Sequence, residues 1–77
     1  MQIENMTTEE RCTLNKIESL LAAQAALDFL YHSHDDSRGL DLATHCEADA
    51  HALWRGLGYA DMPTWELART VSAIVAE

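Results

Sequence analysis

The chain has 77 residues, of which 13 are acidic and 5 are basic, so its formal net charge is −8 with histidine neutral. A chain of this length forms one domain and buries only about 60% of the surface of its unfolded form, which leaves little room for a substrate cavity and argues against an enzyme. Five scattered basic residues form no patch that could neutralise phosphates, so direct binding of nucleic acid or of an anionic membrane is disfavoured.

We expect no targeting or membrane segment in this sequence. Residues 1–11 are polar and acidic, unlike a secretory signal peptide. The longest apolar stretch, 20–31, is interrupted by Gln24 and Asp28 and is too short for a bilayer, which needs roughly 20 apolar residues. Two cysteines are too few for a disulfide scaffold. We therefore expect a soluble, cytoplasmic protein.

A long helix is predicted over residues 8–32, preceded by a frayed segment, 1–6. The residues Thr7-Thr8-Glu9-Glu10 fit a capping box, in which a threonine hydroxyl and a glutamate three residues later satisfy each other's backbone N–H groups. No glycine or proline follows before residue 32, and alanine, leucine, glutamine and glutamate are strong helix formers.

The second half of this helix is apolar almost all round, over residues 20–31, apart from Gln24 and Asp28. A helix that is apolar on every side is normally buried on every side. We expect it either to be the central helix of a three-helix fold or to supply a homodimer or partner interface. Gln24 and Asp28 either mark its narrow solvent-facing strip or form a buried polar pair that fixes helix register.

Residues 32–39 are polar and contain turn-forming Asp, Ser and Gly, so they predict the connection to a second helix at about 41–57. Gly58 is typical of the left-handed residue that follows a helix end. The core side of this helix is predicted to carry Leu42, Cys46, Ala50, Leu53 and Leu57, with Ala43 and Trp54 alongside. The opposite side carries Thr44, Glu47, His51 and Arg55.

A third helix is predicted over residues 63–76, because Pro63 suits the first turn of a helix. Its core face is predicted to contain Leu67, Ala68, Val71, Ile74 and Val75. No strand pattern competes anywhere in the chain. The sequence therefore predicts a single all-α domain over residues 1–77, with one long N-terminal helix and two shorter ones.

All four histidines fall between residues 32 and 51, among several carboxylates. His45 and Asp49 are four residues apart and so adjacent on one helix face, as are Glu47 and His51 on another. If the connection brings His32 or His34 close to His45 and Asp49, these groups suit a divalent metal such as zinc. The spacing matches no recognised metal motif, and exposed histidines in a solvated hinge are the simpler interpretation.

Catalytic motifs are absent from the sequence. No serine lies in a nucleophile elbow, and no glycine-rich phosphate loop is present. Cys46 adjoins His45, but consecutive helical residues do not face each other, and neighbouring carboxylates disfavour a thiolate. We therefore expect neither an enzyme nor a cofactor.

The function predicted from these features is that of a small acidic regulator or inhibitor that binds another protein. One version of the hypothesis has its carboxylates imitate nucleic-acid phosphates and occupy a basic groove, with fast and salt-sensitive association. Tyr59, Met62 and Trp65 would be a good apolar anchor if exposed, or close the end of the core if buried. The predicted partner-binding residues are Asp28, Asp35, Asp36, Asp41, Glu47, Asp49, Tyr59 and Trp65.

In size and charge alone, the chain resembles the small acidic proteins that phages use against host nucleic-acid machinery, such as anti-CRISPR inhibitors. That resemblance implies a partner in a nucleic-acid-handling complex. Two alternatives stay open. One is a metal-binding helical protein that uses the histidines and carboxylates of residues 32–51, and the other is a homodimeric structural or adaptor protein that associates through the apolar half of its first helix.

Overall fold

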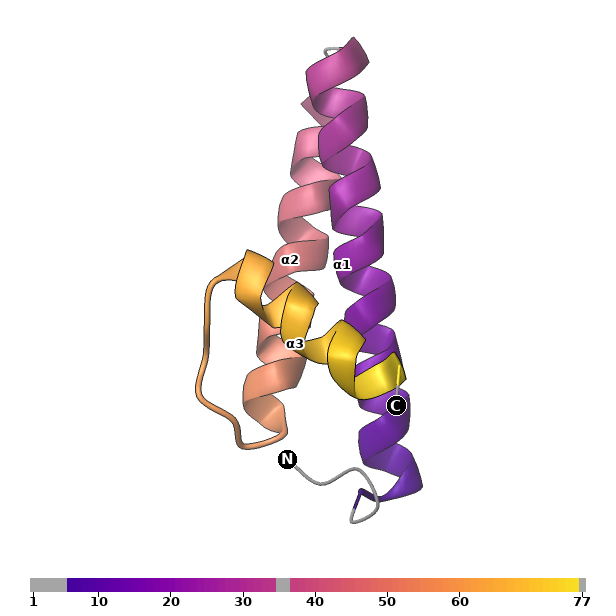
Figure 1. Ribbon diagram of the computed structural model, residues 1–77. Helices are drawn as coiled ribbons and strands as arrows, with labels where there is room; N and C mark the ends of the chain where they lie inside the picture. Colours follow the sequence, from indigo (N-terminus) through magenta and orange to yellow (C-terminus); the bar gives the residue numbers. More distant parts are fainter. Residues whose placement is uncertain (1–5, 35–36, 77) are drawn as a thin grey trace.

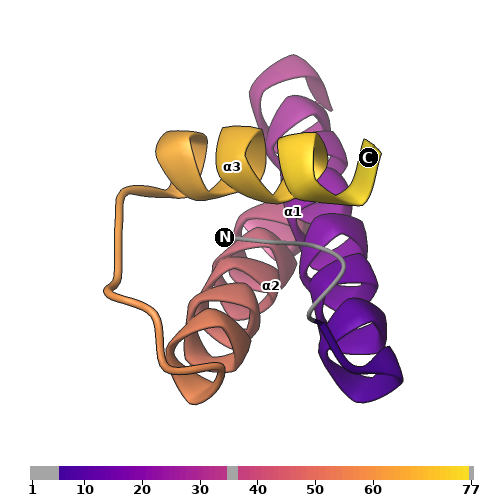
Figure 2. The same ribbon diagram turned by 60° about the horizontal axis from the view of Figure 1, so that its bottom comes forward.

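The computed structural model describes residues 6–34, apart from the His34 side chain, and residues 37–76. These residues form three helices, α1 (Thr8–His34), α2 (Ser37–Gly56) and α3 (Thr64–Ala76), and contain no strand. Helices α1 and α2 lie side by side as an antiparallel hairpin, and α3 crosses one face of it (Figures 1 and 2). The all-α fold with a long first helix and two shorter ones is therefore confirmed.

Helix α1 begins with the capping box that the sequence predicts. The Glu10 backbone N–H donates to Thr7 Oγ1 at 3.1 Å, and the Thr7 N–H donates to Glu10 Oε1 at 3.3 Å. These two bonds satisfy backbone donors that have no partner within the helix. Thr7 is thus the N-cap residue, and the helix runs from Thr8 to two residues beyond the predicted end.

Helix α2 begins at Ser37, four residues earlier than predicted, because Gly39 is a helical residue and not a turn residue. Gly39 is buried against α1. A Cβ atom at this position would lie 2.9 Å from the Leu27 carbonyl oxygen, so only glycine lets the two backbones approach this closely. The glycine that predicts a turn in the sequence serves instead as a helix–helix contact.

The turn after α2 follows the prediction more closely. Gly58 has a φ of 94°, in the left-handed region, and its N–H donates to the Arg55 carbonyl at 2.9 Å. Helix α3 begins one residue after Pro63, whose carbonyl accepts the N–H groups of Glu66 and Leu67 at 3.0 and 2.9 Å. Pro63 is therefore the residue just before the helix and not its first residue.

The core lies where α3 crosses the hairpin. Seven buried residues from all three helices form it, with α1 supplying three, α2 two and α3 two: Leu14, Ile17, Leu21, Ala50, Trp54, Leu67 and Val71. The Trp54 indole N–H donates to the Ala60 carbonyl at 2.9 Å, so the loop before α3 is fastened to this core. The core side predicted for α3 is confirmed at Leu67 and Val71, both fully buried.

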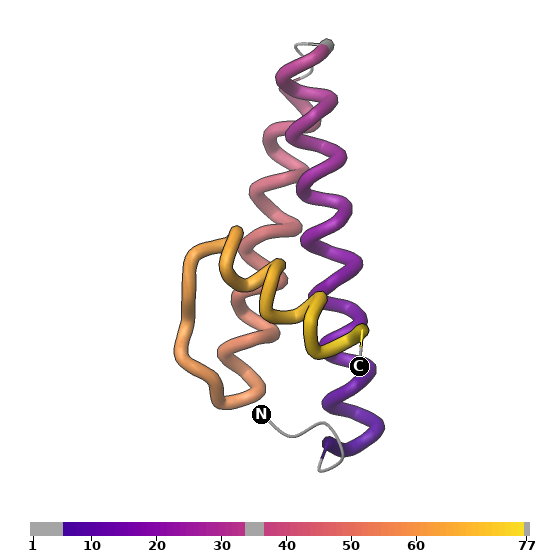
Figure 3. Tube along the Cα trace, in the orientation of Figure 1, coloured from indigo at the N-terminus to yellow at the C-terminus, as the bar shows by residue number. Residues whose placement is uncertain are grey.

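The far end of the hairpin, which comprises residues 22–34 and 37–46, extends beyond α3 (Figure 3). In its described part, the buried residues are the small Gly39 and Ala43. Several large apolar side chains remain exposed there, with Phe29 66% exposed. Leu42 is 54% exposed, so its predicted place on the core side of α2 is wrong. Helix α1 therefore packs against both other helices, but its apolar half is only partly covered by the described residues.

Candidate functional site

A chain of polar side chains joins α2 to the start of α3. His51 Nδ1 lies 2.7 Å from Asp61 Oδ1, and His51 Nε2 lies 2.9 Å from Thr64 Oγ1. The Thr64 hydroxyl donates to Glu47 Oε2 at 2.7 Å, and Arg55 Nη1 donates to Asp61 Oδ2 at 2.9 Å. We refer to these five residues as the His51 network.

Asp61 is held as a carboxylate by its neighbours. Its pKa is lowered from the ordinary value of 3.8, chiefly by the hydrogen bond with His51. Partial burial acts in the opposite direction, while the bonds from Arg55 and from the Met62 backbone N–H add to the lowering. The network therefore places a stable negative charge at the turn between α2 and α3.

The order carboxylate, imidazole, hydroxyl in this network resembles the arrangement that activates a catalytic hydroxyl. The Thr64 hydroxyl, however, donates its proton to Glu47, and it lies half-buried between the two helices. Neither Thr64 nor His51 lines a groove among those described below, although Glu47 lines the hollow between α1 and α2. The geometry thus suits a structural fastening of α3 onto α2, with the His51 side chain only 15% exposed.

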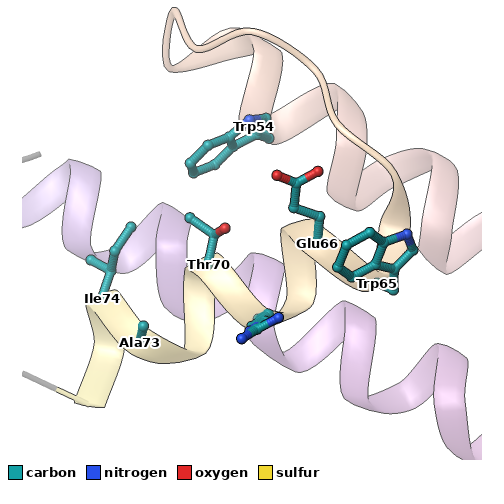
Figure 4. Close-up of a pocket in the computed structure, with 7 residues that line it drawn as sticks. Trp54, Trp65, Glu66, Thr70, Ala73 and Ile74 are labelled. Atoms are coloured by element: carbon teal, nitrogen blue, oxygen red, sulfur yellow. The ribbon is translucent and has the colours of Figure 1, made fainter.

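An open groove of about 610 Å³ lies beside α3, and Figure 4 shows the side chains that line it. The Trp65 side chain, 66% exposed, stands on its edge. Its charged lining groups are Glu66 and Arg69, of opposite sign. The remaining lining residues are mostly apolar: Trp54, Thr70, Ala73 and Ile74. We refer to it as the Trp65 groove.

The predicted partner residues do not gather on one face. Asp28 and Glu47 line a small hollow between α1 and α2, and Glu47 also holds Thr64. Asp41 and Asp49 are exposed on α2, where Asp49 follows Glu47 by two residues and so points to the opposite side of the helix. Asp35 and Asp36 lie outside the described residues.

The predicted aromatic anchors separate into one exposed and one packed side chain. Trp65 is exposed, as an anchor for a partner requires. Tyr59 is half-buried, with its ring centroid 4.6 Å from that of Trp54, and Met62 is half-buried against the core. Of the three, Trp65 is therefore the residue available to a partner.

The predicted histidine–carboxylate metal site is not assembled in the described part of the chain. His32 packs edge-to-face on Tyr31, and His45 and Asp49 are exposed on α2. No group of three or more His, Cys, Asp or Glu side chains among the described residues is arranged to hold a metal ion. The His34 side chain, the fourth predicted ligand, lies outside those residues.

Gln24 and Asp28 form a pair across one turn of α1, where Gln24 Nε2 donates to Asp28 Oδ2 at 2.7 Å. Both side chains are half-buried and line the hollow against α2. They are therefore neither on a fully solvated strip nor in a closed interface. They satisfy each other beside the helix–helix contact.

Sequence reasoning missed Asp61 and Thr64 as members of the His51 network. The four-residue spacing of Glu47, His51 and Arg55 places these side chains along one side of α2, and that signal was visible. These residues were predicted opposite the core side of α2, but the start of α3 covers part of that side. The fold of the turn between α2 and α3 decides which of its polar residues contact this side of α2, and the spacing of residues along α2 does not predict that fold.

No known protein family, curated protein or solved structure matches this chain. In the described residues, no helix combines the length and the apolar character that crossing a membrane requires.

Proposed function

We propose that this protein is a non-enzymatic regulator that binds another protein through the Trp65 groove. The observation that carries the proposal is the 66% exposure of Trp65, a side chain of the type that most often anchors protein interfaces. The groove beside it has an apolar floor and can accept an apolar side chain from a partner. An open groove suits a protruding protein side chain better than it suits an enclosed small molecule.

The partner's chemistry follows from charge. A chain with net charge −8 attracts a basic surface at long range and repels an acidic one. We therefore propose a basic protein with a protruding apolar side chain, such as a component of a nucleic-acid-handling complex. By covering that basic surface, the bound chain would inhibit or regulate its partner.

The two cysteines support a cytoplasmic location for this activity. Cys12 is exposed, Cys46 is half-buried, and both are free thiols. Free thiols persist in a reducing compartment, whereas secreted proteins of this size usually pair their cysteines.

Selection from a library of random twelve-residue peptides tests the proposal. Peptides that bind the wild-type protein are expected to carry an apolar residue among lysines and arginines. They should bind the Trp65→Ala variant about tenfold more weakly or worse, which corresponds to about 1.4 kcal/mol. Raising the salt concentration should weaken binding, because the attraction is electrostatic.

The matched control is Phe29→Ala, which removes a second aromatic side chain that is also 66% exposed but lies on the far end of α1. It should leave peptide affinity unchanged. Peptides that bind the wild type and Trp65→Ala equally, or selected sequences with no excess of basic residues, would contradict the proposed function.

A further inference from the structure

The hairpin has an apolar face that α3 does not cover. On α1, Glu18, Leu21, Ala22 and Ala25 line a hollow shared with α3. On α2, Glu47 and His51 are tied to the start of α3. Residues about half a turn away on each helix form the opposite side, which we call the back face: Leu20, Leu27 and Leu30 on α1, and Leu42, Cys46 and Leu53 on α2.

The spacing and burial of these six residues fit a helix–helix seam. Leu20, Leu27 and Leu30 are separated by seven and three residues, and Leu42, Cys46 and Leu53 by four and seven. Spacings of three, four and seven are those of helices that pack along their length. Leu30 is 42% and Leu42 is 54% exposed, and the other four are half-buried. Nothing in the described part of the chain completes this seam.

We propose that the back face binds the back face of a second copy, giving a homodimer in which two hairpins pack as a four-helix bundle. The charge of this face favours a second copy of the chain as its binding partner. Between residues 16 and 30 of α1 and residues 38 and 53 of α2, the back face carries the basic Lys16 and Arg38 at its rim and one carboxylate, Asp49. Two copies that each carry a charge of −8 repel each other least where carboxylates are fewest.

The size of the face fits a weak dimer. Residues 16–30 and 38–53 each run for roughly 22 Å along the hairpin, and the molecule is about 20 Å wide, which gives a footprint of roughly 450 Å² per copy. Two copies would bury roughly 900 Å², which lies below the about 1,200 Å² or more of stable interfaces and within the range of weak, transient ones. A dissociation constant of roughly tens of micromolar is therefore expected.

A dimer of this kind leaves the proposed partner site open. The Trp65 groove is lined mostly by α3 (Figure 4). Helix α3 crosses one side of the hairpin (Figure 2), and the back face is defined on the other side. The proposal thus concerns a second surface and goes beyond the proposed function. Its test needs no peptide or partner, so that either proposal can fail while the other holds.

Sedimentation equilibrium under reducing conditions tests the proposal on the full chain. The wild type is expected to change from 8.6 kDa to twice that mass between about 1 and 500 µM. The double variant Leu30→Gln/Leu42→Gln should weaken association at least about tenfold. Its two substituted side chains are already exposed, so far-UV circular dichroism should show an unchanged helical fold.

The matched control is Phe29→Gln/Leu40→Gln, which alters two neighbouring exposed apolar side chains that lie outside the back face. Leu40 lines the hollow with Gln24 and Asp28 on the α3 side of the hairpin. This variant should dimerise like the wild type. A wild type that stays monomeric up to about 500 µM, or equal weakening by both double variants, would overturn the proposal.

Cross-linking gives a second measurement that does not depend on the glutamine variants. Cys46 lies near the middle of α2, so it meets its own copy in a dimer whose two-fold axis crosses the helices at mid-height and packs α2 on α2. We propose that arrangement. In the Cys12→Ser variant, a short bismaleimide should therefore join Cys46 to Cys46 of the partner subunit. Adding the Leu30→Gln/Leu42→Gln pair should abolish this product, and no product at dimer-forming concentrations would count against the back face.

Discussion

His51 is the side chain through which α2, the turn and α3 are connected. Its two ring nitrogens form hydrogen bonds with Asp61 and Thr64, and the Thr64 hydroxyl donates a hydrogen bond to Glu47. A hydroxyl has one proton, so Thr64 cannot donate to Glu47 and to His51 Nε2 together. His51 therefore joins Asp61 to Thr64, and the Thr64 hydroxyl extends the network to Glu47.

Acid is expected to weaken the fold through Asp61. A carboxyl whose pKa is lower in the folded than in the unfolded chain stabilises the fold above its unfolded pKa, and this contribution is lost as pH falls through the folded pKa. For Asp61 the loss therefore falls below the ordinary value of 3.8. Urea unfolding at several pH values between about 5 and 2 should show a smaller loss of stability for Asp61→Asn than for the wild type.

Glu66→Gln is the control for this measurement, because it removes an exposed carboxylate near the same turn and leaves the bonds of Asp61 in place. It should lose stability with acid as steeply as the wild type. If Asp61→Asn and the wild type lost the same unfolding free energy as the pH falls, the hydrogen bond with His51 would not stabilise the ionised Asp61 side chain.

At the scale of the elements, the packing of α1 against α2 depends on a glycine within a helix. Gly39 permits a backbone approach that any side chain would obstruct. Local sequence could not reveal this role, because glycine beside Asp and Ser is typical of a turn. The capping box at Thr7 and the left-handed Gly58 were predictable from sequence, since each depends on residues within a few positions of one another.

The glycines of α2 should respond to alanine in opposite directions. Gly56 has open space around it, so Gly56→Ala should stabilise the fold by about 0.5–1 kcal/mol through helix propensity. Gly39→Ala should destabilise it by about 1–3 kcal/mol, because the new methyl group meets the Leu27 carbonyl. Urea unfolding at one fixed protein concentration measures both.

Gly58→Ala is a third comparison, because it introduces backbone strain but no steric clash. Its positive φ disfavours a side chain although no atom lies within 4 Å of the added Cβ, so a loss of about 1 kcal/mol is expected. If Gly39→Ala stabilised the protein as much as Gly56→Ala, the conclusion that α1 and α2 approach closely at Gly39 would be wrong.

At the scale of the whole molecule, the number and order of helices followed from periodicity, but the direction of α3 did not. The apolar stripe of α3 predicts that Leu67 and Val71 are buried without specifying which part of the hairpin they cover. Because α3 crosses near Ile17 and Trp54, it leaves Phe29, Leu30 and Leu42 exposed. Long-range packing thus decided which of the predicted apolar residues became surface.

This uneven packing predicts uneven stability along the hairpin. Opening the helices near Ile17 and Trp54 disrupts the core, whereas opening near Phe29 and Leu42 exposes little additional apolar surface. Backbone amides of residues 26–31 and 40–44 should therefore exchange with solvent at least about tenfold faster than those of residues 14–21 and 50–54 in dilute protein.

Protein concentration separates the intrinsic weakness of the far end from the effect of a partner. If two back faces meet, exchange at residues 26–31 and 40–44 should slow as concentration rises through the dimer range, because association stabilises whatever it covers. The Leu30→Gln/Leu42→Gln variant should lose this dependence and keep the fast exchange. Uniform protection along the hairpin in dilute protein would contradict the prediction, since a core confined to the α3 crossing cannot protect both ends equally.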